Sequence, residues 1–245
     1  MGQDIISSFR RYEVKYFLTA EQRAALLPEL ERHFQVDQYG QHTISNLYYD
    51  TDTFDITRNS VEKPVYKEKL RVRAYGLQDP ETGRVFIELK KKYDHVVYKR
   101  RIAASVPEAK AFLHGGPDPA GADRQIAGEI RYFMERNRPE PKVYLSYRRI
   151  AMAGTEDPEL RLTMDQELLW RTEELDLCRE PYGTLILPDE MTLMEIKVPG
   201  TMPLWLARLL SDQRIYRASF SKIGTCYTKF LLPQIFDKKV VTTHV

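Results

Sequence analysis

Residues 69–73 read Lys-Leu-Arg-Val-Arg, in which basic and apolar side chains alternate. Side chains two positions apart lie on the same face of a β-strand, so Lys69, Arg71 and Arg73 share one face and Leu70 and Val72 share the other. Three like charges on one strand face repel each other unless an anion relieves them. The stretch therefore predicts a strand with one apolar face and one face suited to an anion.

Charged residues at the same two-residue spacing recur on nearly every other predicted strand. They are Arg11, Glu13 and Lys15; Glu88 and Lys90; Lys99 and Arg101; Arg148; Arg161; Asp165 and Glu167; and Glu195 and Lys197. For any single strand, the better explanation is an ordinary sheet with one face on the core and one in water. Taken together, the like charges of residues 69–73 and the repeated Glu-x-Lys pattern favour a β-barrel whose charged face turns inward.

The hydrophobic pattern and the turn residues predict the other elements. Strands are expected near residues 11–16, 44–50, 65–75, 84–93, 95–105, 142–153, 160–167 and 191–198, and helices near 20–34, 52–58, 106–113, 123–137, 203–210 and 221–231. Thr19 with Gln22, and Asp123, are residues that cap a helix start. The Gly- and Pro-rich loop at 114–122 is too short to mark a domain boundary. We therefore predict one α+β domain spanning residues 1–245, with seven to nine mostly antiparallel strands.

Composition limits the classes of function. Lys and Arg number 37 against 35 Asp and Glu, a formal charge of +2, which argues against a uniformly basic surface but allows a local basic site. Basic residues do not alternate with aromatic ones as in single-strand nucleic-acid binders, so no nucleic-acid partner is expected. Cys178 and Cys226 lack the spacing of a metal or disulfide framework. No apolar run approaches the ~20 residues of a membrane span. A cytoplasmic protein is expected.

The residue types of the charged face point to phosphate chemistry. An inward ring of Lys and Arg needs a polyanion, because an unpaired buried charge costs several kcal/mol. Arg offers two parallel donors to phosphate oxygens, and Lys offers a mobile point charge. The interleaved carboxylates would repel phosphate but suit Mg²⁺ or Mn²⁺, which bridge carboxylate and phosphate oxygens. The sequence therefore predicts metal-assisted chemistry on a polyphosphorylated substrate.

Eight short motifs in one order also resemble a known family. They are Glu13-Val14-Lys15-Tyr16, Asn46-Leu47-Tyr48-Tyr49-Asp50-Thr51, Lys69-Leu70-Arg71-Val72-Arg73, Glu88-Leu89-Lys90-Lys91-Lys92, Ser146-Tyr147-Arg148-Arg149, Arg161-Leu162-Thr163-Met164-Asp165, Met194-Glu195-Ile196-Lys197 and Ser219-Phe220-Ser221-Lys222. From about Phe9 to Leu232 the chain resembles the VTC domain. This is the catalytic part of the vacuolar transporter chaperone polyphosphate polymerase, which belongs to the triphosphate tunnel metalloenzymes of the CYTH-like superfamily.

The resemblance implies an eight-stranded antiparallel β tunnel barrel with flanking helices, and transfer of the γ-phosphoryl group of ATP onto a growing polyphosphate chain. Residues implied to grip phosphates are Lys15, Arg71, Arg73, Lys90, Arg148, Arg161, Lys197 and Lys222. Further substrate contacts are implied for Lys69, Lys99, Arg101 and Tyr147, the last near the nucleotide base. Glu195 would be the principal ligand of Mn²⁺ or Mg²⁺, with Asp165, Glu167 and Glu13 as helpers.

The resemblance leaves two other activities open. Many tunnel enzymes that hydrolyse triphosphate begin with Glu-x-Glu-x-Lys, whereas Arg11 stands at the first position of this chain, which favours the polymerase. An inorganic triphosphatase or nucleotide phosphohydrolase is the first alternative, and a non-catalytic polyphosphate sensor is the second. Any membrane coupling would require a separate partner. Charge reversal at Arg73 is expected to abolish polyphosphate binding at little cost in stability.

Overall fold

The computed structural model describes residues 12–94 and 96–235, so Arg11 lies outside the described residues. The chain divides into two compact units. Among the described residues, unit 1 comprises 12–42, 148–166 and 187–219, and unit 2 comprises 43–94, 96–147, 167–186 and 220–235. Three long strands contribute residues to both units, namely β2 (Phe34–Asp50), β6 (Glu140–Gly154) and β7 (Arg161–Arg171).

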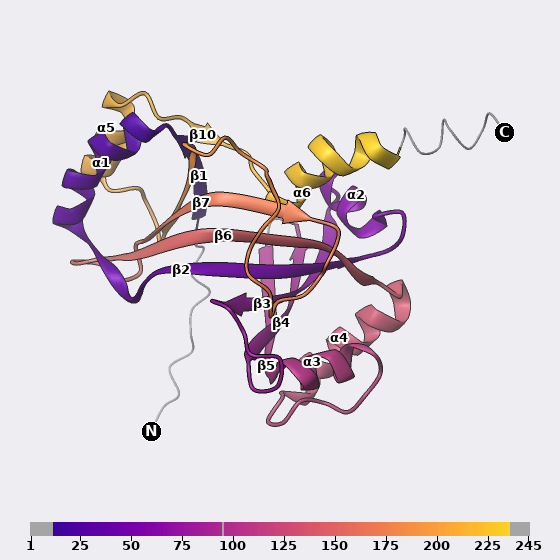
Figure 1. The fold of residues 1–245 in the computed structure, drawn as a ribbon. Helices are drawn as coiled ribbons and strands as arrows, with labels where there is room; N and C mark the ends of the chain where they lie inside the picture. Colours follow the sequence, from indigo (N-terminus) through magenta and orange to yellow (C-terminus); the bar gives the residue numbers. More distant parts are fainter. Residues whose placement is uncertain (1–11, 95, 236–245) are drawn as a thin grey trace, which may run out of the picture. The chain divides into compact units, whose positions relative to one another are not determined.

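Unit 1 packs two helices against a group of antiparallel strands. Its own elements are β1 (Tyr12–Leu18), α1 (Ala20–His33), β9 (Thr192–Val198), α5 (Leu204–Asp212) and β10 (Arg217–Ala218). Leu26 and Leu30 of α1 and Leu206 of α5 are buried against Leu162 and Ile196 of the strands. Figure 1 shows α1 and α5 next to each other beside β1 and β10. The strand residues that alternate with this core therefore point away from the helices.

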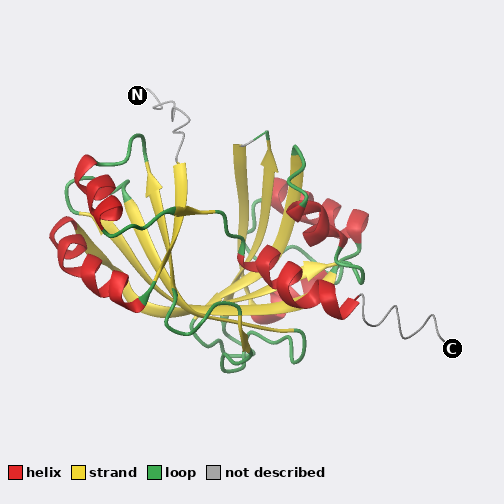
Figure 2. Ribbon diagram, turned by 90° about the horizontal axis from the view of Figure 1, so that it is seen from above, coloured by secondary structure: helices red, strands yellow, loops and turns green. Residues whose placement is uncertain are grey.

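Unit 2 is built in the same way around a three-stranded meander. Its elements are α2 (Asp55–Val61), β3 (Tyr66–Tyr75), β4 (Arg84–Tyr93), β5 (Val96–Ser105), α3 (Val106–Leu113), α4 (Arg124–Asn137), β8 (Thr184–Leu185), α6 (Lys222–Cys226) and a π-helical turn, η1 (Tyr227–Leu231). Leu70, Ile87 and Ile102 share one face of the meander and pack with Phe112 of α3 and Ile130 of α4. Figure 2 shows helices (red) packed beside the strands (yellow).

The strands form one antiparallel sheet with the order β10-β1-β9-β7-β6-β2-β3-β4-β5, and β8 pairs with β7. The α+β class is therefore confirmed, but the sheet has ten strands and not eight. The two additional strands are β8 and β10, which are two residues long each. The strand order has two ends, and no pairing among the described residues joins β10 to β5. Barrel closure is accordingly not confirmed by the strand pairing.

Local sequence signals predicted most of the other boundaries. The meander strands and α3 lie within one residue of their expected ends. Thr19 and Gln22 form the expected capping box of α1, and the Asp123 side chain accepts from Ile126 N at the start of α4. The first half of β2 was missed because residues 35–43 are mostly polar and include Gly40, which is typical of a loop.

No helix among residues 12–94 and 96–235 is both long enough and apolar enough to cross a membrane.

Candidate functional site

A buried carboxylate, Glu88, forms the centre of the charged face of unit 2. Its side chain is 2% exposed. Its oxygens accept from Arg71 Nε at 2.8 Å, Lys99 Nζ at 2.9 Å and Arg101 Nε at 2.7 Å, and Arg73 Nε lies 3.8 Å away. We call Arg71, Arg73, Glu88, Lys99 and Arg101 the Glu88 cluster. Four cations surround one carboxylate, so the cluster carries a formal charge of +3.

The register of the meander explains why these residues meet. Arg71 of β3 is paired with Glu88 of β4, which is paired with Arg101 of β5. The next row on the same face is Lys69, Lys90 and Lys99. The opposite face carries the leucine and isoleucine side chains that pack on α3 and α4. α3 and α4 therefore cover the apolar face of the meander, and its charged side chains point away from these two helices.

Electrostatics favours the charged forms of Glu88 and Arg71 in the Glu88 cluster. Burial opposes the charge of Glu88, but Arg71, Arg73 and Lys99 outweigh burial and hold the pKa of that carboxyl well below its usual range. Burial also opposes the charge of Arg71, but Tyr48 and Glu88 outweigh it and raise the pKa of the guanidinium. Burial lowers the pKa of Lys99, which Glu88 only partly offsets. The carboxylate therefore remains ionised near neutral pH, and the cluster keeps its surplus of positive charge.

Four other predicted residues lie on the same unit. Lys222, the first residue of α6, places its Nζ 4.6 Å from the centre of the Tyr147 ring. The Tyr147 hydroxyl accepts from Arg73 Nη2 at 3.2 Å, and Lys69 Nζ donates to the hydroxyl of Ser221 at 3.3 Å. Lys90 is paired with Lys69 and is exposed. The structure thus brings the predicted residues of unit 2 onto one basic face, except Glu167.

The expected mild effect of charge reversal at Arg73 is wrong. The Arg73 residue is only 7% exposed, and its guanidinium donates to Asn46 Oδ1 at 3.0 Å as well as to Tyr147. A glutamate at this position would place a second buried carboxylate beside Glu88. Such a substitution would cost several kcal/mol of folding free energy, so a loss of binding could not be separated from a loss of structure.

Unit 1 carries a second charged group, centred on Glu195. Lys15 Nζ lies 3.2 Å from Glu195 Oε1 and 3.3 Å from Glu13 Oε1, so one ammonium bridges two carboxylates. Arg149 Nη2 lies 3.7 Å from Glu195 Oε2. Arg149 also donates to both oxygens of Asp165, at 2.5 and 2.6 Å. We call Glu13, Lys15, Arg149, Asp165 and Glu195 the Glu195 cluster.

Two further predicted cations flank the Glu195 cluster on paired strands. Lys197 of β9 is paired with Glu13 of β1 on one side and with Arg161 of β7 on the other. Glu195 and Lys197 flank Ile196, and Arg161 precedes Leu162. Since Ile196 and Leu162 point into the helix-covered core, these three charged side chains point away from it. These residues therefore lie on the same face of unit 1 as the Glu195 cluster.

Arg148 is not brought into this cluster. It shares a strand face with Ile150 and Met152, which pack toward the helices of unit 1. With the Gln41 amide oriented so that its oxygen faces the guanidinium, Arg148 Nη2 donates to that oxygen at 2.9 Å. The sequence offered two adjacent arginines, and the structure puts Arg149 on the charged face.

Glu167 does not follow the alternation that paired it with Asp165. It has φ 50°, in the left-handed region, in the middle of β7. A left-handed residue in a strand interrupts the two-residue periodicity, as in a β-bulge. The assumption that Asp165 and Glu167 point the same way therefore fails, and Glu167 belongs to unit 2.

The Asp165–Arg149 pair yields a stability prediction. Asp165 has no exposed surface and Arg149 is 14% exposed, so removing one partner leaves a nearly buried charge unpaired. We expect Asp165→Asn to lower the free energy of unfolding by roughly 3 kcal/mol, measured by urea denaturation. Asp189→Asn, at an exposed position, is the matched control and is expected to change stability by less than about 0.5 kcal/mol. Equal stability of the two variants would show that the pair contributes nothing.

The family model described as the VTC domain matches residues 10–231 of the chain. The chain belongs to the VTC domain family. The match confirms the resemblance that the eight motifs indicated. This VTC domain is also similar in fold to a candidate adenylate cyclase from Bacillus halodurans, with a TM-score of 0.51 and 16% identity over 85% of this chain and 92% of that chain.

A second solved structure that is similar to this VTC domain is the PH1819 protein from Pyrococcus horikoshii OT3. It has a TM-score of 0.41 and 13% identity, over 91% of this chain and 99% of that chain. At such identities a structural likeness concerns the fold alone. A search of curated proteins gave no match.

The Glu195 cluster of this VTC domain fits a divalent cation that the substrate helps to bind. Mg²⁺ is commonly held by one or two carboxylates plus phosphate oxygens and waters. Glu13 and Glu195 supply two carboxylates, and Thr163 Oγ1, on the residue paired with Glu195, is buried without a hydrogen-bond partner. No group of three His, Cys, Asp or Glu suited to a metal occurs among the described residues. The donor set therefore suits a site completed by phosphate and water.

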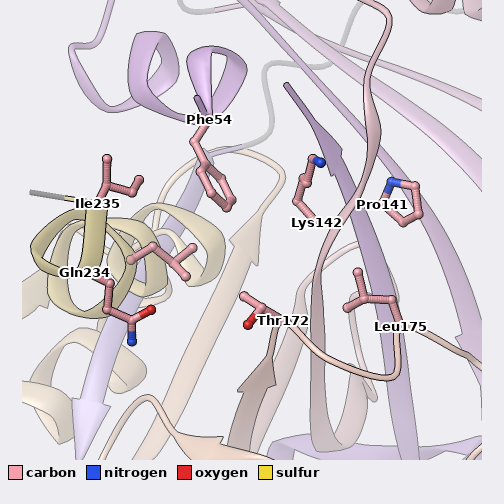
Figure 3. A pocket seen from close by; sticks show the side chains of 8 residues that line it. Phe54, Pro141, Lys142, Thr172, Leu175, Gln234 and Ile235 are labelled. Carbon is pink, nitrogen blue, oxygen red and sulfur yellow. The ribbon is translucent and has the colours of Figure 1, made fainter. Parts of the chain in front are cut away.

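Two cavities of unit 2 do not suit a polyphosphate chain. One has a volume of about 310 Å³ and is lined by Phe54, Leu175 and Ile235 (Figure 3), and its one basic side chain, Lys142, already pairs with Asp52. The other, of about 890 Å³, is lined by acidic as well as basic residues, including Glu62 and Glu68. Neither cavity offers the surplus of positive charge found at the Glu88 cluster.

Sequence reasoning missed three contributors to the charged faces of this VTC domain. Glu88 was read as part of an alternating pattern, and its role as the shared partner of four cations was not foreseen. Arg149 was passed over for its neighbour. Tyr48, whose hydroxyl accepts from Arg71 Nη1 at 3.1 Å, carried no signal except its position opposite Arg71 in the strand register.

Proposed function

We propose that this VTC domain is a metal-dependent polyphosphate polymerase that transfers the γ-phosphoryl group of ATP to a growing polyphosphate chain. The observation that carries the proposal is the Glu88 cluster, where four cations share one buried carboxylate and leave a formal charge of +3. A surplus of this kind favours a polyanion, and arginine pairs with phosphate oxygens through two parallel donors. Family membership supports the same reading.

In this proposal Arg71, Arg73, Lys99 and Arg101 hold phosphates, with Lys69, Lys90, Lys222 and Tyr147 as further contacts. Lys15, Arg161 and Lys197 serve phosphates from unit 1, and Arg149 takes the place first assigned to Arg148. Glu195 and Glu13 hold the divalent cation, Mg²⁺ or Mn²⁺, which would neutralise charge on phosphate oxygens when bound. Asp165 is a less suitable metal ligand because both of its oxygens already accept from Arg149.

The proposed reaction needs no nucleophile from the protein. An oxygen of the terminal phosphate attacks the γ-phosphorus of ATP, a new P–O–P linkage forms, and ADP leaves with the electron pair of the broken bond. Transfer of this kind depends mainly on positioning and on neutralising the charge of the equatorial oxygens. Arginines fixed by Glu88, Tyr48 and Asn46 are already oriented, so little reorganisation is needed when the substrate binds.

The proposal includes residues 1–245 as a single VTC-type triphosphate tunnel domain. The family match and the fold shared with the Bacillus halodurans structure support this part. The partners proposed are ATP and inorganic polyphosphate, without nucleic acid, in the cytoplasm.

The choice of Arg149 over Arg148 gives a specific prediction. Arg148→Gln is expected to change the KM for ATP and kcat by less than about twofold, because the side chain lies on the face that packs toward the helices. Arg149→Lys, which keeps the charge but loses the paired donors to Asp165, is expected to lower kcat/KM by at least about tenfold. Steady-state kinetics on the two variants decides the point. The reverse order of effects would return the role to Arg148.

The function itself is tested with three substrates in parallel. Purified protein is incubated with ATP, inorganic triphosphate or long polyphosphate, each with Mg²⁺ or Mn²⁺, and the products are separated by gel electrophoresis. We expect ATP to yield a polymer that an exopolyphosphatase degrades. Orthophosphate as the sole product would indicate a triphosphatase or nucleotide phosphohydrolase. Tight polyphosphate binding without turnover under either metal would indicate a sensor.

A further inference from the structure

The end of the β3–β4–β5 meander exposes an unusual group of apolar side chains. Val65, Tyr66, Tyr93, Val96, Val97 and Tyr98 account for six of the 15 large hydrophobic residues that are exposed among the described residues. Tyr93, Val96 and Val97 are 57%, 52% and 50% exposed. We call these six residues the meander tip. Contiguous exposed apolar patches usually mark a site of contact with another protein or with a membrane.

Strand pairing holds the meander tip together. Tyr66 is paired with Tyr93, and Tyr93 with Val96, while Asp94 N donates to Val65 O at 3.0 Å. The next row contains Lys67, Lys92 and Val97. Apolar side chains therefore emerge from both faces at the end of the strands, and lysines follow one residue behind them.

The surroundings of the meander tip are strongly basic. Residues 63–69 and 90–101 contain nine Lys and Arg but two Asp and Glu. Lys91 and Arg100 pair with Glu129, and Lys99 and Arg101 pair with Glu88, so the tip's own cations are Lys63, Lys67, Lys69, Lys90 and Lys92. Lys67 and Lys92 face each other across the strands, and burial together with Lys92 and Lys63 lowers the pKa of Lys67. Like charges in this arrangement are unfavourable unless an anionic partner approaches.

From this combination we infer that the meander tip docks onto the surface of an anionic lipid bilayer. Tyrosine is enriched at membrane–water interfaces, where its ring is apolar and its hydroxyl reaches water. Lysines just behind an apolar tip lie where lipid phosphates are found and are attracted to them. The contact would be superficial, because six side chains on strand ends cannot span a bilayer.

Other occupants fit the meander tip less well. A second copy of the chain would bring another basic surface of the same charge and be repelled. A free polyphosphate would pair with the lysines but would leave Val96, Val97 and the tyrosines in water. An anionic bilayer satisfies both the apolar and the basic residues with one surface.

The test is vesicle co-sedimentation with the full chain. We expect binding to vesicles of phosphatidylcholine with one quarter phosphatidylglycerol, and at least about tenfold weaker binding to pure phosphatidylcholine. Val96→Ser with Val97→Ser is expected to weaken binding at least about fivefold, and Lys63→Gln with Lys92→Gln at least about tenfold. The matched control, Val36→Ser with Lys110→Gln, changes exposed residues elsewhere and should bind as the parent does.

Two results would overturn the inference. Absence of binding to the anionic vesicles would contradict the inference and would indicate that the meander tip binds a protein partner. Vesicle binding by the Val96→Ser, Val97→Ser variant and by the Lys63→Gln, Lys92→Gln variant as strong as that of the parent would show that another basic surface, and not the meander tip, holds the lipid phosphates. Because none of these measurements uses turnover, the inference can fail or hold independently of the proposed polymerase activity.

Discussion

Glu88→Gln is expected to lower kcat by at least about a hundredfold while the affinity for inorganic triphosphate stays equal or becomes tighter. The substitution raises the formal charge of the cluster from +3 to +4, which favours anions. It also removes the negative charge and one of the two acceptor oxygens that orient Arg71, Lys99 and Arg101. Steady-state kinetics and isothermal titration with triphosphate measure the two effects separately. Glu81→Gln, at an exposed position on the β3–β4 link, is the matched control.

A purely structural role for Glu88 would give a different pattern. Without an anion, the glutamine variant should lose roughly 3 kcal/mol of folding free energy, because four cations lose their buried partner. Saturating triphosphate should restore much of this loss, since a ligand that binds the folded state stabilises it. Equal losses of triphosphate affinity and kcat, with no rescue by the anion, would contradict the positioning role.

Glu88 also predicts how stability depends on pH. Its pKa is held well below the ordinary value of 4.5, so its contribution to stability is fully present above that pH. As pH falls below about 4.5, the unfolded chain takes up the proton first, and stability is lost progressively. Urea denaturation between pH 7 and pH 3 should therefore show a shallower decline for Glu88→Gln than for the parent. Identical slopes would mean that other carboxylates govern the acid transition.

Glu195→Gln is the second large effect and concerns the metal. The amide keeps the size of the side chain but removes one of the two carboxylates bridged by Lys15. We expect kcat to fall by at least about a hundredfold at saturating Mg²⁺ or Mn²⁺, with metal-free triphosphate affinity changed by less than about threefold. Glu190→Gln, just before β9 and exposed, serves as the control. Full activity in Glu195→Gln would remove this residue from the proposed metal site.

The strands of the meander were predictable because the signals that define them lie within each strand and in the adjacent turns. Residues 69–74 alternate basic and apolar side chains, the links carry turn residues, and Ser105 with Glu108 forms the capping box that starts α3. The expectation that helices cover the apolar face is confirmed in unit 2 by the packing of Leu70 and Ile87 against α3 and α4.

The roles within the charged faces were less predictable, because they depend on tertiary register. Alternation assigns faces only while the backbone stays regular, and Glu167 breaks it with one left-handed residue. Periodicity alone does not say which of the adjacent Arg148 and Arg149 lies on the charged face. The packing of Ile150 and Met152 with the core of unit 1 decides this, because Arg148 shares their face of the strand. The like charges of residues 69–73 were expected to require an external anion, yet a buried glutamate on the next strand relieves part of their repulsion.

If the protein transfers phosphate from ATP to a polymer, a radioactive label on the γ-phosphate of ATP must appear in the polymer. Purified protein is incubated with ATP labelled with ³²P at the γ-position and with Mn²⁺ or Mg²⁺, and label is measured over time in polymer and in orthophosphate. We expect most of the label to enter material that an exopolyphosphatase degrades, and we expect Glu195→Gln to abolish this transfer. Label appearing in orthophosphate from the start, with none in polymer, would contradict it.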